Sequence, residues 1–100
     1  MGMADDFEHL GLSMDHAIKV CKHMLGMDVR KTYKRHGKVF YKPYRNYFYG
    51  FQKELDYMTG LGLIVKQQDV DDKHPYYWLT KEGTRWLERK TGIVIREVED

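Results

Sequence analysis

The stretch Phe51–Leu87, FQKELDYMTGLGLIVKQQDVDDKHPYYWLTKEGTRWL, decides the fold of this chain. Its first apolar residues recur at helical spacing and end in glycine, which gives the chain a tight exit. Two β-prone runs follow, Leu63–Gln68 and Tyr76–Leu79, separated by the polar turn Asp69–Pro75. The stretch therefore predicts a helix, two antiparallel strands and a second helix.

The second of these helices has clear boundary signals. Thr80 is a good N-cap, and Gly92 follows the last helical residues, which include Trp86 and Leu87. Gly83 lies one turn into the helix, where a missing side chain lets the helix approach the sheet closely. Beyond it, Ile93–Val98 is β-prone and is predicted to add an edge strand.

The N-terminal part contains one further helix. Residues 1–12 are expected to be a flexible leader with a short apolar patch of Phe7, Leu10 and Leu12. Ser13 is placed as an N-cap, and apolar residues then recur at helical spacing up to Leu25. The pattern predicts a helix over residues 14–25 that ends at Gly26.

Residues 28–45 allow two interpretations. Asp28 could cap a short helix that ends at Gly37, or Lys31–Arg35 and Lys38–Lys42 could be two strands that turn at His36-Gly37. The β-prone run after the glycine favours the hairpin.

The segment between Pro43 and Gly60 carries one helical stripe of apolar residues, spaced alternately by four and three. It consists of Tyr44, Phe48, Phe51, Leu55 and Met58. Asn46 is a candidate cap, but Gly50 interrupts the pattern at a cost of about 1 kcal/mol in a helix interior. A start near Phe51, with an end at Gly60 or Gly62, is therefore the alternative.

Length and composition limit the class of protein. One hundred residues suit a single domain with one core. The N-terminus lacks a secretory signal, the longest apolar run is too short to cross a membrane, and Cys21 has no partner for an intramolecular disulfide. We therefore expect one α+β domain, residues 1–100, in the cytoplasm.

The charge is concentrated in one segment. The whole chain has a formal net charge of +2, but residues 29–53 carry Lys and Arg with no Asp or Glu. A concentrated run of positive charge indicates what kind of partner the protein binds more directly than its net charge does.

Two segments resemble a known family. Leu55–Ile64 (LDYMTGLGLI) and Tyr77–Gly83 (YWLTKEG) are similar to the motifs that follow the recognition helix and the wing of winged-helix domains. The resemblance covers about residues 46–90 and implies three main helices on a small antiparallel sheet, with the hairpin as an extra element before the main helix. It also implies DNA binding, although the loop in the position of the wing holds Asp69, Asp71 and Asp72, whereas phosphate contacts require cations.

A second, broader resemblance concerns residues 35–48, RHGKVFYKPYRNYF. The segment looks like one found in small phage and prophage proteins of Gram-positive bacteria, a group to which no activity is assigned. The resemblance therefore implies a phage or prophage origin and says nothing about the biochemical mechanism.

The acid-free segment suggests nucleic-acid binding, because its cations interleave with aromatic residues that can stack on bases. The residues predicted to contact phosphates are Arg30, Lys31, Lys34, Arg35, Lys38, Lys42, Arg45 and Lys53. The competing interpretation places the aromatic side chains in the core and the cations in solvent.

The alternative function is a protein-interaction module without nucleic-acid binding, including a homodimer through the C-terminal strand. The sequence predicts no enzyme, cofactor or metal site: Cys21 and His23 lie two residues apart on a helix and so face different directions, and Cys21 lies on the apolar stripe.

Overall fold

The computed structural model describes residues 6–96 of the chain. Within them the elements follow in the order α1 (Asp6–His9), α2 (Met14–Met24), β1 (Tyr33–Arg35), β2 (Lys38–Tyr41), β3 (Phe48–Tyr49), α3 (Lys53–Gly60), β4 (Ile64–Gln67), β5 (Tyr76–Leu79), α4 (Lys81–Thr91) and β6 (Ile93–Ile95). Of the helices in this range, none is both long and apolar enough to span a bilayer.

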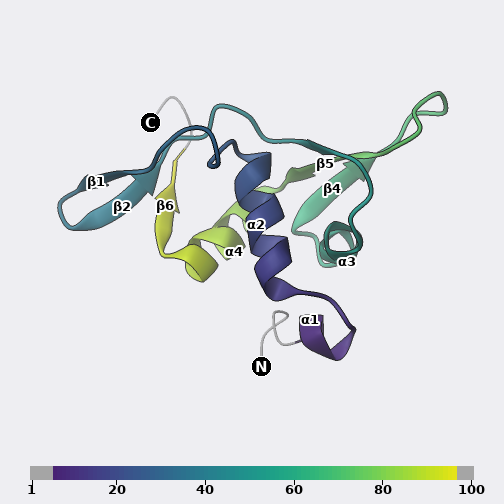
Figure 1. Ribbon diagram of the computed structural model, residues 1–100, viewed down its shortest axis with the longest axis horizontal. Helices are drawn as coiled ribbons and strands as arrows, with labels where there is room; N and C mark the ends of the chain where they lie inside the picture. The colour runs from purple at the N-terminus through teal and green to yellow at the C-terminus, as the bar shows by residue number, and fades with distance from the viewer. Residues whose placement is uncertain (1–5, 97–100) are drawn as a thin grey trace.

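The fold is α+β, as predicted, but it contains two small sheets rather than one. The first has the order β1-β2-β6, and its β2–β6 pair is parallel; the second has the order β3-β5-β4 and is antiparallel throughout. Figure 1 shows α2 and α4 between the two sheets and α3 beside β4.

The predicted helix–strand exit is confirmed. Gly62 has φ +81°, its N–H donates to the Thr59 carbonyl, and the Leu63 N–H donates to the Met58 carbonyl. These two bonds make a Schellman motif, which satisfies the last carbonyls of α3 and turns the chain into β4. The register pairs Ile64 with Leu79, so the predicted antiparallel strand pair is present.

The start of α4 is also as predicted. The Thr80 hydroxyl oxygen accepts from the Gly83 N–H at 3.0 Å and donates to the Gly62 carbonyl at 2.9 Å. One side chain therefore caps α4 and holds it to the end of α3. Gly92, with φ +72°, ends the helix.

The helix predicted over residues 14–25 is confirmed as α2. Its N-cap Ser13 accepts from the His16 N–H, and the Ser13 N–H donates to the carboxylate of Glu54 at 3.0 Å. Glu54 is buried, so this bond ties the start of α2 to the first turn of α3.

The stripe that begins at Tyr44 is helical only in its second half, which corrects the longer prediction. Phe48 lies in β3, and α3 begins at Lys53, close to the alternative start near Phe51. Gly50 has φ +132°, a conformation that excludes a helix and favours glycine. Asn46 caps no helix. Its amide oxygen accepts from the Leu79 N–H and its amide nitrogen donates to the Leu79 carbonyl, which is the pair of bonds that a neighbouring strand would make.

Residues 6–12 differ from the expected flexible leader. Phe7 in α1 is fully buried, with its ring centroid 5.2 Å from that of Tyr57 and 6.3 Å from that of Trp86. Leu12 packs against the core and Leu10 is exposed. The leader prediction for residues 1–5 lies outside the described residues.

Candidate nucleic-acid interface

Residues 33–41 of the basic segment form a β-hairpin, so the alternative of a short helix from Asp28 to Gly37 is wrong. His36 and Gly37 have φ of 55° and 76° at the turn. Two consecutive positive φ values give a turn whose twist matches that of the strands it connects. The register pairs Arg35 with Lys38 and Tyr33 with Phe40.

The hairpin is fixed to the body at its base. Tyr41, the last residue of β2, is fully buried, and its hydroxyl donates to the Leu25 carbonyl at 2.7 Å. Burial raises the pKa of this phenol above its ordinary value. The parallel pairing of Tyr41 with Ile95 attaches the same strand to β6.

Alternation along the strands gives the hairpin a basic and aromatic outer face. Tyr33 and Phe40 are stacked, with ring centroids 5.7 Å apart and planes at 17°. Arg35 and Lys38 are a directly opposed pair two residues further along, so they share that face. The guanidinium of Arg96 lies 5.3 Å from the centre of the Phe40 ring. Sequence reasoning missed Arg96, which is far from the hairpin along the chain and near it only through the β2–β6 pairing.

The eight predicted phosphate-contacting residues fall into two groups. Five are exposed on the hairpin or next to it: Lys31, Lys34, Arg35, Lys38 and Lys42. The other three, Arg30, Arg45 and Lys53, contact parts of the protein itself. The ammonium of Lys53 lies 3.5 Å from the Gly11 carbonyl, at the start of α3 and away from the hairpin.

Arg30 and Arg45 hold the connection between the hairpin and β3. Their guanidinium carbons lie 4.9 and 5.4 Å from the centre of the Tyr44 ring. Arg30 donates to the Lys42 carbonyl at 3.1 Å. The Tyr44 ring rests on Gly26, where an added Cβ would lie 2.3 Å from the ring. These cations therefore stabilise the fold locally.

Arg45 also closes the C-terminus of α2. It donates to the His23 carbonyl at 2.9 Å and lies 3.4 Å from one carboxylate oxygen of Asp28, while the other oxygen is 2.6 Å from His23 Nδ1. The hydrogen bond with His23 is the main cause that lowers the pKa of Asp28 below its ordinary value. Asp28 therefore neutralises part of the basic segment instead of capping a helix.

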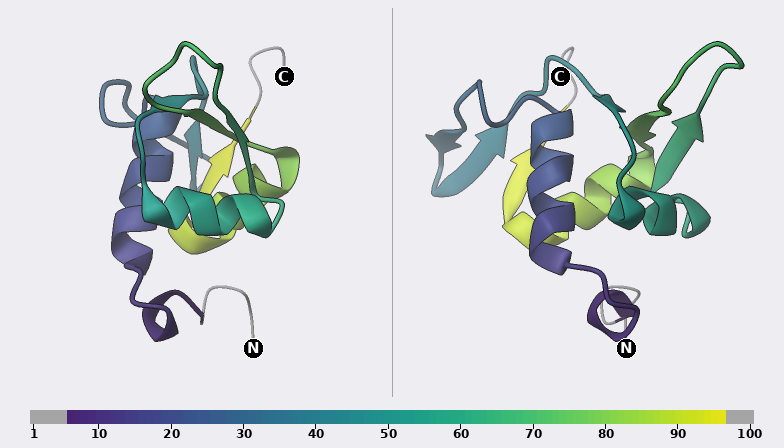
Figure 2. Two further views of the ribbon diagram at one scale, coloured as in Figure 1. Left: turned by 90° about the vertical axis from the view of Figure 1, so that its right-hand side faces the viewer. Right: turned by 45° about the vertical axis from the view of Figure 1, so that its right-hand side comes forward.

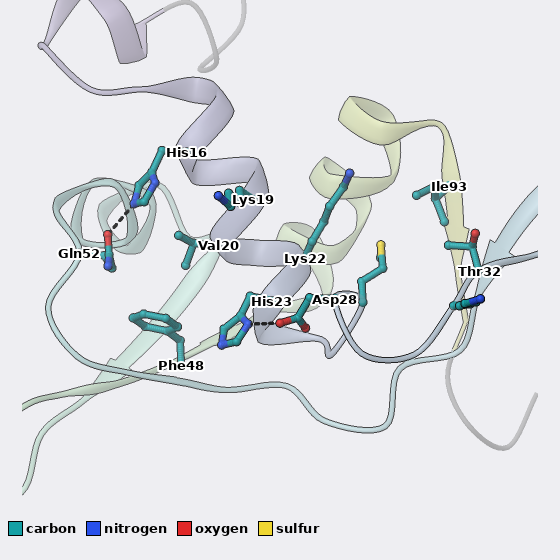
Figure 3. A pocket seen from close by; sticks show the side chains of 12 residues that line it. His16, Lys19, Val20, Lys22, His23, Asp28, Thr32, Phe48, Gln52 and Ile93 are labelled. Carbon is teal, nitrogen blue, oxygen red and sulfur yellow. Dashed lines mark hydrogen bonds and ion pairs between the residues drawn. The ribbon is translucent and has the colours of Figure 1, made fainter.

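A groove of about 800 Å³ opens beside the base of the hairpin. Its walls are α2, the residues that lead into β1, and the starts of β3 and β6. Figure 3 shows Phe48, His16 and Gln52 at one end and Thr32 and Ile93 at the other.

A second exposed feature lies on the other sheet. Tyr49 and Tyr76 are cross-strand neighbours with ring centroids 4.7 Å apart, and Tyr47 lies 6.3 Å from Tyr76. His74 contacts both Tyr49 and Phe51. We call these five residues, Tyr47, Tyr49, Phe51, His74 and Tyr76, the aromatic patch. All are exposed. Within the run Tyr76-Tyr77-Trp78, Tyr76 is exposed and Tyr77 is buried.

The acidic loop between β4 and β5 projects at the opposite end of the molecule from the hairpin, as Figures 1 and 2 show. The longest dimension of the molecule is 44 Å. The loop therefore offsets little of the charge on the hairpin.

Two further features bear on chemistry, the thiol of Cys21 and the spacing of potential metal ligands. Cys21 is buried, and burial raises the pKa of its thiol to about 12, so it is an unreactive core residue, as predicted. Across residues 6–96, the structure forms no cluster of three His, Cys, Asp or Glu side chains that could hold a metal ion.

Comparison with protein-family models, with curated proteins and with solved structures gave no match.

Proposed function

We propose that this is a non-enzymatic protein that binds nucleic acid through the outer face of the β1–β2 hairpin. The observation that carries the proposal is the stacked Tyr33–Phe40 pair with Arg35, Lys38 and Arg96 around it. Cations neutralise phosphates, and aromatic faces stack on bases or sugars. The hairpin itself contains no carboxylate to oppose them.

We further propose a winged-helix-like frame for this hairpin. Support comes from α3 and its glycine exit into β4, the projecting loop between β4 and β5, and the capped entry into α4. In this frame the hairpin, and not the acidic loop, contacts the nucleic acid. The segment that resembles phage and prophage proteins, residues 35–48, includes β2, and we propose a phage or prophage origin for the protein on that resemblance.

Replacement of Arg35, Lys38 and Lys42 together by Glu tests the hairpin. Fluorescence anisotropy with labelled duplex and single-stranded DNA at low and moderate salt should show weak, salt-sensitive binding by the native protein. The triple variant should bind at least about 100-fold more weakly, because it loses phosphate contacts and adds repulsion.

The matched control replaces Lys81, Arg85 and Arg89 by Glu on α4, with the same change in net charge. It should retain most of the binding, because these exposed residues lie outside the hairpin. Absence of binding by the native protein at low salt, or equal losses in the two triple variants, would refute the proposal.

A protein-interaction module is the second candidate, and the aromatic patch favours it. Exposed, clustered tyrosines are typical of protein interfaces. The outer edge of β6, by contrast, has few backbone N–H groups left to pair with a strand of a second chain. The Ile93 N–H donates to the Thr91 hydroxyl at 3.2 Å, and the Ile95 N–H donates to the Glu88 carboxylate at 2.7 Å. If the DNA titration shows no binding at low salt, contact through the aromatic patch becomes the better account.

A further inference from the structure

The groove beside α2 has the size and the lining of a ligand site. Its volume of about 800 Å³ falls within the range of roughly 300–1,000 Å³ typical of small-molecule sites. It lies beside the base of the hairpin, on the side that carries Val39 rather than Phe40, and it uses residues from α2, β3 and β6.

The rim of the groove favours an anion. Lys19, Lys22 and Lys31 line it, and the single carboxylate in the lining belongs to Asp28. That carboxylate is already bound to His23 and Arg45. The three ammonium groups therefore present an excess of positive charge to whatever enters.

Part of the lining of the groove is apolar and includes one aromatic ring. Val20, Met27, Phe48 and Ile93 line it. The Phe48 ring is held by the edge of His23, with centroids 5.9 Å apart, and by the pairing of Phe48 with Tyr77. A ring that is fixed in this way can receive a flat ligand at little cost in side-chain entropy.

The end of the groove at Phe48 also holds polar groups that could recognise a base. His16 Nε2 and Gln52 Oε1 are 2.8 Å apart, so an imidazole and an amide lie together there (Figure 3). A nucleotide site requires a ring to stack on, donors and acceptors for the edge of the base, and cations for the phosphate. The lining of the groove contains all three kinds of group.

We propose that this groove binds one nucleotide unit of single-stranded nucleic acid, with the base at Phe48 and its phosphate at Lys19 and Lys22, while Lys31, next to Thr32 at the other end, meets the following phosphate. The inference rests on the proposed function and deepens it.

Lys31 and Thr32 lead directly into β1, and Ile93 pairs with Val39, which pairs with Lys34, so the groove adjoins the face of the hairpin that carries Lys34. The neighbouring phosphate of the same strand would therefore reach Lys34 first. This continuity favours a nucleotide over an acidic peptide.

The test is a set of NMR titrations of the ¹⁵N-labelled full chain. The probes are the four deoxynucleoside monophosphates, inorganic phosphate, thymidine and a Glu-rich peptide. At least one monophosphate should shift the amide signals of Lys22, His23 and Phe48, with an affinity about tenfold or more above that of inorganic phosphate and of thymidine.

Two double variants, each of which loses two positive charges, show which lysines bind the monophosphate. Lys19→Gln with Lys22→Gln should weaken monophosphate binding about tenfold, since it removes two phosphate contacts. Lys34→Gln with Lys38→Gln, on the hairpin, should leave monophosphate binding unchanged and weaken oligonucleotide binding. All four positions are outside the buried core, so the variants should fold.

Several results would overturn the inference: no shifts in the groove, equal shifts with inorganic phosphate, or a Glu-rich peptide that binds as tightly as the best monophosphate. Oligonucleotide binding that depends on the hairpin and not on Lys19 and Lys22 would remove this inference and leave the proposed function standing. Absence of oligonucleotide binding at low salt would remove both.

Discussion

Single residues set how closely the elements of this protein approach one another. Gly83 is the sharpest case: a Cβ at this position would lie 1.9 Å from the Leu63 carbonyl oxygen and 2.9 Å from a Leu79 methyl carbon. The backbone of α4 therefore lies directly against Leu63, in the connection between α3 and β4, next to Gly62, whose carbonyl accepts from Thr80.

Gly83→Ala should lower the free energy of unfolding by about 2 kcal/mol or more. Alanine favours a helix interior by about 1 kcal/mol, but overpacking against fixed backbone costs more than that gain. Urea denaturation followed by circular dichroism measures the change.

The control for this substitution is Gly60→Ala. Gly60 is also helical, has no positive φ, and has open space around its Cβ position. Its replacement should leave stability unchanged or slightly raised. Equal effects at the two glycines would contradict the close approach at Gly83.

At the scale of elements, the C-terminus of α2 connects the core to the basic segment. Gly26 turns the chain, Arg45 donates to the His23 carbonyl, and Asp28 bonds to both His23 and Arg45. A cation near the last carbonyls of a helix also complements its dipole. These hydrogen bonds and ion pairs hold the hairpin and β3 on either side of the groove.

Asp28→Asn should destabilise the protein at pH 7 by an amount that disappears in acid. The folded-state pKa of Asp28 lies below its ordinary value of 3.8, mainly because of the His23 hydrogen bond. Its contribution is therefore fully present above about pH 4 and is lost as the pH falls through the folded-state pKa.

Urea denaturation of the native protein and of Asp28→Asn at pH 7, 5, 3 and 2 provides the measurement. The difference in unfolding free energy between the two proteins reports Asp28 together with its bonds to His23 and Arg45. The part that vanishes between pH 5 and pH 2 follows the protonation of this carboxylate. A difference that stays constant down to pH 2 would rule out the role assigned to this carboxylate.

At the scale of the whole molecule, opposite charges are separated. The hairpin and the acidic loop project at opposite ends of a molecule 44 Å long (Figure 1). Because the Debye length is about 8 Å at physiological ionic strength, the two ends should act independently.

Asp69→Asn, Asp71→Asn and Asp72→Asn together should therefore leave the affinity for DNA within about twofold at 0.15 M salt. Anisotropy titrations of the native protein and the triple variant compare the two. A gain of tenfold or more would place the nucleic acid against the acidic loop and refute the proposed role of the hairpin.

Sequence patterns predicted most of the elements because their signals are local. Ser13, Thr80, Gly62 and Gly92 act on neighbouring N–H and C=O groups, so caps and exits can be recognised without coordinates. His36-Gly37 likewise indicated the hairpin.

The errors occurred where a distant contact determined the local structure. The helical stripe through Tyr44 and Phe48 did not reveal that Phe48 would pair with Tyr77 and Asn46 with Leu79. The short N-terminal patch did not reveal that Phe7 would be enclosed by Tyr57 and Trp86. In each case tertiary packing overrode local propensity.

The candidate site shows the same division. The sequence alone determined that one acid-free segment would carry the cations and aromatic residues, because charge is a property of each residue wherever it lies. Only the tertiary structure assigned Arg30 and Arg45 to Tyr44, brought Arg96 to Phe40, and assembled the groove from α2, β3 and β6. Those arrangements depend on strand register and helix packing between segments far apart in the chain, which no local pattern contains.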